Sequence, residues 1–188
     1  MNRNIYLIGF MGSGKTTVGG IVSDALGLPF VDLDALIEER AGRTIREVFT
    51  DSGEGAFRAL ERLALAEVSG SGPAVVACGG GVVTVAQNIE VMRDTGVVVL
   101  LDVRPDEVLS RVGGDDSRPL LDSDAEGIER LMRKRREAYV QAADAVVETS
   151  GKSAEAVAKE VTALAEGMME ELGAPSSASE TGEEGASR

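Results

Sequence analysis

The stretch Ile5-Tyr6-Leu7-Ile8-Gly9-Phe10-Met11-Gly12-Ser13-Gly14-Lys15-Thr16 decides the fold of this 188-residue chain. Its apolar beginning predicts a buried strand, and the remainder matches the phosphate-binding loop pattern G-x-x-x-x-G-K-[ST]. Glycines let backbone N–H groups turn toward phosphate oxygens, and the helix that follows adds the positive end of its dipole. We therefore expect a nucleoside-triphosphate site formed by Gly12, Ser13, Gly14, Lys15, Thr16 and Thr17.

Composition excludes several other classes of chemistry. With one cysteine, Cys78, and no histidine, the chain lacks the residues for a disulfide, a Cys/His zinc site or a His-dependent triad. A net charge of −13 disfavours binding to nucleic acid or to an anionic membrane, because Lys and Arg drive both. No apolar stretch reaches the roughly 18 residues of a membrane span, and no cleavage-site pattern begins the chain, so we expect a cytoplasmic protein.

An acidic protein that binds a polyanionic nucleotide should concentrate positive charge in its cleft. The candidates are Lys15, Arg58, Arg111, Arg118 and Arg135, although for any one arginine taken alone a solvated surface position is the better expectation.

Short β-branched runs alternate with helical patterns along the chain. The expected strands are 5–8, 30–33, 74–78, 97–102 and 145–148. The expected helices are 14–26, 34–41, 44–50, 54–69, 84–94, 105–112, 125–142 and 153–172. This alternation predicts a three-layer α/β/α fold of the P-loop NTPase type with a five-stranded parallel sheet.

We expect one domain over residues 1–172. Residues 113–124 combine loop chemistry at both ends with a cationic, proline-containing centre, which suits a mobile lid over a ligand, although a plain surface loop is the simpler reading. Residues 173–188 lack apolar periodicity and are expected to form a disordered acidic tail.

Asp32-Leu33-Asp34 ends the second expected strand. In extended backbone, side chains two residues apart project to the same side, and ligands of open parallel sheets bind at the carboxyl ends of the strands. One carboxylate could hold Mg²⁺ together with the Thr16 hydroxyl, and the other could orient an attacking hydroxyl or accept its proton. The ordinary alternative makes Asp34 the N-cap of the next helix. Beside a phosphate loop, we favour the ligand roles.

Three further features have both a functional and an ordinary interpretation. Arg58 and Glu61 lie three apart on an expected helix and can form a surface pair. Arg135 belongs to a basic run that would by itself be a solvated helix face, with Tyr139 one turn later on the same side. The glycines at 79–81 would let a ligand approach the backbone closely, or would simply form a turn after the third strand.

Taken together, these positions resemble the shikimate kinase family from about Asn4 to Leu164. Besides the phosphate loop, the motifs that carry the resemblance are Asp32-Leu33-Asp34, Phe57-Arg58-Ala59-Leu60-Glu61, Gly79-Gly80-Gly81, Arg118-Pro119-Leu120 and Arg135-Arg136-Glu137-Ala138-Tyr139. The resemblance implies transfer of the γ-phosphoryl of Mg·ATP to the 3-hydroxyl of shikimate. The products would be ADP and shikimate 3-phosphate, on the route to chorismate and the aromatic amino acids.

The resemblance also implies a role for each residue. Lys15, Asp34 and Arg118 would be catalytic, with Asp34 holding the acceptor hydroxyl. Thr16 and Asp32 would hold one Mg²⁺. Arg111 would lie over the adenine of ATP, and Arg118 would approach the transferring phosphoryl. The substrate-binding set would be Asp34, Arg58, Glu61, Gly79, Gly80, Gly81 and Arg135, in which Arg58 and Arg135 clamp the substrate carboxylate and Glu61 orients Arg58.

Some alternatives stay open from the sequence. Residues 148–153 lack the N-x-x-x-P-like pattern that family members often carry, so the adenine contacts there are not defined. Arg136 could replace Arg135 in the clamp, although the spacing to Tyr139 favours Arg135. Another small P-loop kinase, acting on gluconate or a nucleoside monophosphate, and a nucleotide-binding regulatory protein without turnover are the competing functions. A monomer is the default expectation.

Overall fold

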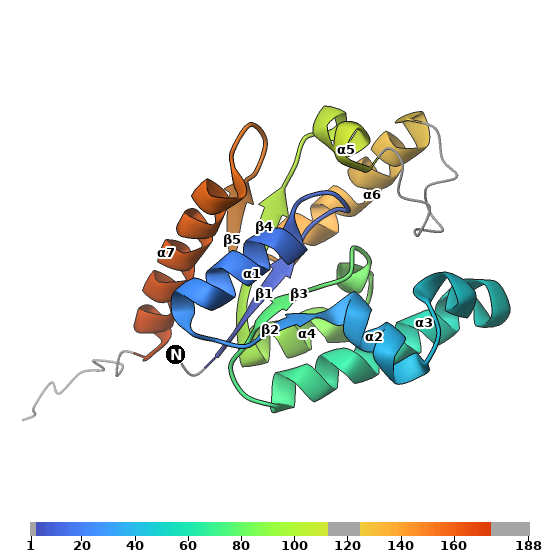
Figure 1. Ribbon diagram of the computed structural model, residues 1–188, viewed down its shortest axis with the longest axis horizontal. Helices are drawn as coiled ribbons and strands as arrows, with labels where there is room; N and C mark the ends of the chain where they lie inside the picture. The colour runs from blue at the N-terminus through green and yellow to red at the C-terminus, as the bar shows by residue number, and fades with distance from the viewer. Residues whose placement is uncertain (1–2, 113–124, 174–188) are drawn as a thin grey trace, which may run out of the picture.

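A five-stranded parallel sheet forms the centre of the computed structural model, which describes residues 3–112 and 125–173 (Figure 1). The strands, in their order across the sheet, are β2 (Phe30–Asp32), β3 (Val75–Ala77), β1 (Asn4–Ile8), β4 (Gly96–Asp102) and β5 (Ala145–Glu148). The central strand β1 is buried along its whole length, as a parallel strand covered on both faces should be. The predicted sheet is thereby confirmed.

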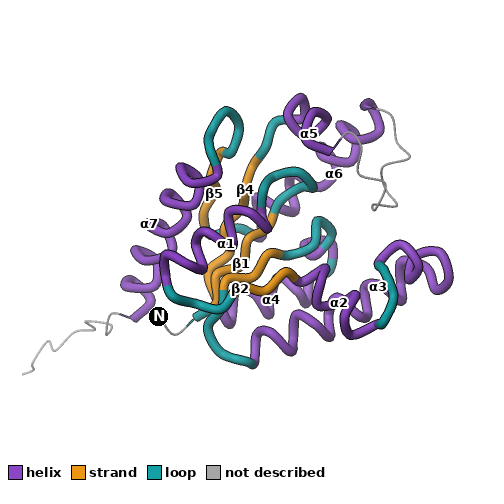
Figure 2. The backbone as a smooth tube through the Cα atoms, in the orientation of Figure 1, coloured by secondary structure: helices purple, strands orange, loops and turns teal. Residues whose placement is uncertain are grey.

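Helices cover both faces of this sheet (Figures 1 and 2). They are α1 (Lys15–Leu26), α2 (Leu33–Ala41), α3 (Ile45–Gly70), α4 (Ala86–Thr95), α5 (Pro105–Val112), α6 (Ala125–Ala142) and α7 (Ala154–Gly173), with a short 3₁₀ turn, η1 (Val82–Thr84). The alternation of side chains along β1 explains the two cores. Ile5 and Leu7 pack with α1 and α7, whereas Tyr6 and Ile8 pack with α3, α4 and α6. The result is the predicted three-layer arrangement.

The helices expected at 44–50 and 54–69 are the two parts of α3, which meet at Gly53, where the backbone leaves the helical region with φ 79° and ψ 174°. A positive φ of this kind strains residues other than glycine, which explains why the break falls there. By contrast, β2 ends at Asp32 rather than at the expected Leu33, because Leu33 is already the first residue of α2.

The lid expected at 113–124 lies outside the described residues, as does the expected tail beyond Gly173. The division of the chain into a domain and a tail therefore stays a prediction. Among the helices that the structure describes, none has both the length and the apolar character needed to cross a membrane.

Candidate active site

The loop between β1 and α1 has the conformation that phosphate binding requires. Gly12 and Gly14 have φ values of 73° and 91°, in the left-handed region where glycine is favoured. Gly14 is the N-cap of α1 and supplies no side-chain cap, so the first N–H groups of the helix face the loop without a capping side chain. The Lys15 ammonium donates to the carbonyl oxygens of Gly9 at 3.0 Å and Phe10 at 2.9 Å. The loop therefore has the backbone shape of a phosphate-binding loop.

A cavity of about 250 Å³, here called the phosphate cavity, opens over this loop. It brings the N-terminus of α1 together with the ends of β2 and β3. The residues that line it are Gly12, Gly14, Lys15, Thr16, Thr17, Asp32, Asp34, Ala77, Cys78 and Gly80. Ser13, also expected at the nucleotide, is buried within the loop, and its N–H donates to the Phe10 carbonyl at 3.2 Å. Burial raises the pKa of the Cys78 thiol, which therefore stays protonated and is not a nucleophile.

Thr16 and Asp32 both line the phosphate cavity and are in contact there. The Thr16 hydroxyl donates to Asp32 Oδ2 at 2.8 Å. A hydroxyl oxygen and a carboxylate suit Mg²⁺, which prefers oxygen ligands and usually retains waters and phosphate oxygens as the rest of its shell. Within residues 3–112 and 125–173 no group of three or more acidic, Cys or His side chains could hold a metal by itself. The pair fits a metal that arrives with a nucleotide.

The two aspartates reach the cavity for a different reason from the one the sequence suggested. Asp32 is the N-cap of α2, and its Oδ1 accepts hydrogen bonds from the N–H groups of Asp34 at 3.1 Å and Ala35 at 3.3 Å. Asp34 is neither a strand residue nor the cap, because it lies in the first turn of α2. The expectation of two carboxylates on one side of a strand was wrong, although both do line the same cavity.

A second cavity of about 320 Å³, here called the acceptor cavity, adjoins the first. Both cavities are lined by Asp32, Asp34 and Gly80, so Asp34 lies where they meet. The other residues that line the acceptor cavity are Met11, Ala35, Glu38, Ile45, Phe49, Phe57, Arg58, Glu61, Gly79, Gly81 and Arg135. All seven residues expected to bind the substrate, Asp34 included, line this cavity.

Arg58 is held in the acceptor cavity by a buried carboxylate. Its Nη1 lies 2.9 Å from Glu61 Oε2, and the Glu61 side chain is completely buried. Burial raises the pKa of Glu61, and the adjacent Arg58 guanidinium opposes that increase. The guanidinium also lies 5.1 Å from the centroid of the Phe57 ring. These contacts fix the cation in place rather than leaving it as a solvated surface residue.

Two glycines after β3 lie against neighbouring side chains. A Cβ at Gly79 would lie 2.5 Å from Asp34 Oδ1, and a Cβ at Gly81 would lie 2.6 Å from Arg58 Cζ and closer still to its Nη1 and Nη2. A Cβ at Gly80 would meet nothing nearer than 3.7 Å. The sequence suggested that the glycines make room for a ligand. At positions 79 and 81 the room is instead occupied by the protein's own Asp34 and Arg58.

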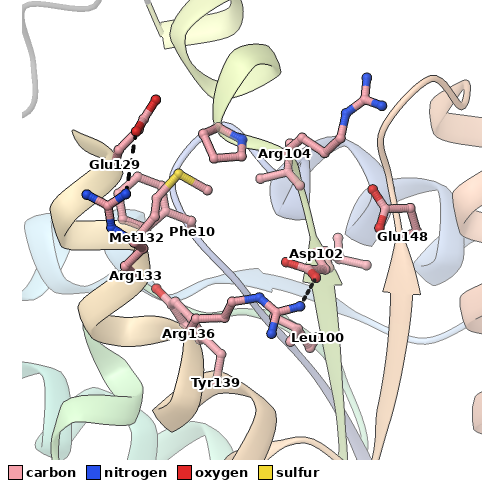
Figure 3. Close-up of a pocket in the computed structure, with 13 residues that line it drawn as sticks. Phe10, Leu100, Asp102, Arg104, Glu129, Met132, Arg133, Arg136, Tyr139 and Glu148 are labelled. Atoms are coloured by element: carbon pink, nitrogen blue, oxygen red, sulfur yellow. Dashed lines mark hydrogen bonds and ion pairs between the residues drawn. The ribbon is translucent and has the colours of Figure 1, made fainter. Parts of the chain in front are cut away.

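The phase of α6 separates Arg135 from Arg136. Arg135 Nη1 donates to the Gly80 carbonyl at 3.1 Å, and the Tyr139 hydroxyl donates to the same oxygen. Arg136 lies instead in a different cavity of about 380 Å³ between α6 and β4, where it pairs with Asp102 at 3.4 Å (Figure 3). The structure therefore brings Arg135, and not Arg136, to the acceptor cavity. Burial raises the pKa of Tyr139 to about 12, so its hydroxyl remains a donor at neutral pH.

The apolar side of the acceptor cavity was not predicted from the sequence. Phe49 and Phe57, on either side of the Gly53 break, lie with ring centroids 4.8 Å apart, and Ile45 and Met11 line the same cavity. A signal was present in the sequence, because Phe49 and Phe57 flank Gly53 next to the expected Arg58 site. Of the expected nucleotide contacts, Arg118 lies outside the described residues, and only the backbone of Arg111, within α5, is described.

The phosphate cavity and the arginine-lined acceptor cavity meet at the Asp34 carboxylate. This arrangement is typical of a P-loop kinase that acts on a small anionic molecule. The family model of shikimate kinase matches residues 11–166, and the chain belongs to that family. The chain is 46% identical over 173 residues to the shikimate kinase of Moorella thermoacetica, covering 92% of this chain and 99% of that protein. It is 42% identical to the enzyme of Persephonella marina, with coverage of 85% and 96%.

Solved structures show the same relationship. The shikimate kinase of Acinetobacter baumannii in complex with shikimate aligns with a TM-score of 0.83 at 36% identity, over 86% of this chain and 92% of that one. The enzyme of Aquifex aeolicus aligns with a TM-score of 0.78 at 36% identity. A gluconokinase of Sinorhizobium meliloti aligns with a TM-score of 0.54 at 15% identity, which shows a shared fold alone.

Proposed function

We propose that the protein is an ATP-dependent kinase that transfers the γ-phosphoryl of ATP to the 3-hydroxyl of shikimate. Membership of the family supports the reaction class and the acceptor. The observation that carries the assignment is the position of Asp34, at the junction of the phosphate cavity and the acceptor cavity. A hydroxyl held by Asp34 would face the end of a nucleotide bound over the phosphate loop.

Phosphoryl transfer passes through a loose transition state, so the protein contributes alignment and charge compensation. Lys15 would supply positive charge to the β- and γ-phosphates, exchanging its contacts with the Gly9 and Phe10 carbonyls for phosphate oxygens. Thr16 and Asp32 would hold Mg²⁺, supported by their hydroxyl–carboxylate contact of 2.8 Å. When bound, the metal would neutralise charge that develops on the phosphate oxygens.

Asp34 would hold the acceptor hydroxyl and take its proton as transfer proceeds. The attacking oxygen needs little deprotonation beforehand in a loose transition state, so orientation by a carboxylate is sufficient. The adjacent Gly79 leaves room for the Asp34 carboxylate against the backbone.

The acceptor cavity suits a small ring that carries a carboxylate. Arg58 and Arg135 provide two guanidinium groups, which match a carboxylate geometrically as a single ammonium would not. Phe49 and Phe57 provide an apolar surface for the ring. A nucleoside monophosphate would need a base-reading pocket and cations directed at its phosphate, and gluconate has no ring, so these two acceptors fit the cavity less well.

The remaining roles extend beyond the described residues. Arg118 would approach the transferring phosphoryl, and Arg111 would stack over the adenine. We further propose that the enzyme acts in the cytoplasm as a monomer with one Mg²⁺ per chain.

The product distinguishes this reaction from its alternatives. After incubation with Mg·ATP and shikimate, phosphorus NMR of the purified product should show the phosphate coupled to the proton on carbon 3, and the Asp34→Asn variant should form it far more slowly. A phosphate on another hydroxyl, or no phosphorylated shikimate at all, would overturn the assignment.

A further inference from the structure

Arg58 contacts a second carboxylate besides Glu61. Glu54 Oε1 accepts from Arg58 Nε at 3.3 Å and from Arg58 Nη2 at 3.1 Å, while Glu61 Oε2 accepts from Nη1. All three nitrogens of the guanidinium are therefore engaged by the protein's own acids. The Nε and Nη2 pair is one of the edges through which arginine binds a carboxylate with two parallel hydrogen bonds.

Glu54 and Glu61 differ in how easily each can move away from the Arg58 guanidinium. The Glu61 side chain is completely buried, so withdrawing it from Arg58 would leave a buried carboxylate without its cation. The Glu54 side chain is 67% exposed and can rotate into water at little cost. Glu54 is also the first residue of the second part of α3, directly after the Gly53 break. The helix dipole favours a negative charge at that position, even when the carboxylate no longer contacts Arg58.

We propose that Glu54 is an internal competitor of the acceptor's carboxylate. In the structure its carboxylate occupies the Nε/Nη2 edge of Arg58, and the substrate carboxylate takes that edge when Glu54 rotates into solvent. The inference rests on the proposed function, because it assumes that Arg58 binds the acceptor's carboxylate. Glu54 thereby lowers the affinity for the acceptor while the Arg58 side chain stays fixed by Glu61, Phe57 and Gly81.

The ordinary reading of the same contact predicts the opposite sign. An i,i+4 pair of glutamate and arginine on a helix could simply hold Arg58 in its binding position. Removing a support of that kind would weaken acceptor binding, whereas removing a competitor would strengthen it. The direction of the change therefore decides between the two roles.

The test compares Glu54→Gln with the wild-type enzyme and with Glu129→Gln. Glu129 forms an i,i+4 pair with Arg133 at 3.7 Å on α6, away from the acceptor cavity, and is the matched control. Shikimate affinity would be measured by calorimetry, and KM and kcat by coupled ADP release. Because an exposed pair contributes little free energy, we expect the Kd and KM of Glu54→Gln for shikimate to fall about two- to fivefold, with kcat unchanged.

The methyl ester of shikimate provides an internal control, since it lacks the anionic carboxylate. Glu54→Gln should bind the ester no better than the wild-type enzyme does. A Kd for shikimate that is unchanged or higher in Glu54→Gln would overturn the inference, and so would an equal gain for the ester. If Glu54→Gln is poorly folded by thermal melting, Glu54→Asp, whose carboxylate is one methylene further from Arg58, should show the same tighter binding.

Failure of the inference can be told apart from failure of the proposed function. If the wild-type enzyme does not phosphorylate shikimate, or if Arg58→Lys binds shikimate as tightly as the wild type, the carboxylate clamp itself is wrong. If the wild-type enzyme phosphorylates shikimate and Arg58→Lys binds it more weakly, but Glu54→Gln binds it no more tightly than the wild type, only the competitor role is wrong.

Discussion

Gly81→Ala should disable the acceptor site without disturbing the fold. The φ of Gly81 is −107°, a value that any residue adopts, so an alanine meets no backbone strain there. The obstacle is Arg58, whose Cζ lies 2.6 Å from the position of the new Cβ. An ordinary contact is about 3.4 Å, so the guanidinium must move by about 1 Å.

A displacement of about 1 Å in a group that positions a substrate can cost on the order of 10²-fold in rate. We therefore expect kcat/KM for shikimate to fall about 100-fold, which corresponds to about 2.7 kcal/mol of transition-state stabilisation. The affinity for ATP should change little, because the phosphate loop lies between β1 and α1 and does not include Gly81 or Arg58. The loss of kcat/KM should therefore appear in the KM for shikimate and in kcat, and not in the affinity for ATP.

The assay is coupled ADP release at varied shikimate, with nucleotide affinity and thermal melting measured separately. Gly55→Ala is the matched control, because Gly55 lies in α3 near Arg58 and a Cβ there would meet nothing within 4 Å. If Gly81→Ala kept kcat/KM within about threefold of the wild type, the tight contact between Arg58 and Gly81 would not position the clamp, and the reasoning would be refuted.

Three further changes test separate parts of the site. Asp34→Asn should lower kcat by about 10²- to 10⁴-fold while ATP affinity, measured by calorimetry, is retained, and equal turnover would remove Asp34 from the chemistry. Arg135→Lys should raise the KM for shikimate about tenfold, because an ammonium cannot replace the planar guanidinium, and an unchanged KM would contradict the clamp. Tyr139→Phe removes the hydroxyl that donates to the Gly80 carbonyl and should cost about 1 kcal/mol in urea unfolding. The pKa of Tyr139 is raised from its ordinary 10.0 to about 12, so its stabilising contribution is complete below pH 10 and lost as the pH rises toward 12. The phenylalanine variant should therefore lose less stability than the wild type between those pH values, and equal losses would show that Tyr139 does not titrate as proposed.

The sequence predicted the fold well because its signals are local. The apolar β1 run and the glycine spacing of the loop set the first strand, turn and helix, and the alternation of the later segments required parallel strands. The break in α3 was also predictable, since Gly53 tolerates a positive φ. The first turn of α2 was predicted less well. Two carboxylates reach one cavity there because Asp32 caps α2, and not because a strand alternates.

The tertiary contacts could not be predicted in the same way. The choice between Arg135 and Arg136 depends on the phase of α6 against the sheet, because neighbouring helical residues point about 100° apart. That Gly79 and Gly81 accommodate Asp34 and Arg58 depends on how α2 and α3 pack against the end of β3. Pattern alone could not show either.

Acceptor specificity distinguishes a shikimate kinase from the other P-loop kinases. In a coupled ADP-release assay with Mg·ATP, shikimate should be compared with gluconate, CMP, AMP and a blank without acceptor. We expect turnover that depends on shikimate alone. ADP release with a different acceptor, or none with shikimate while ATP still binds, would contradict that expectation.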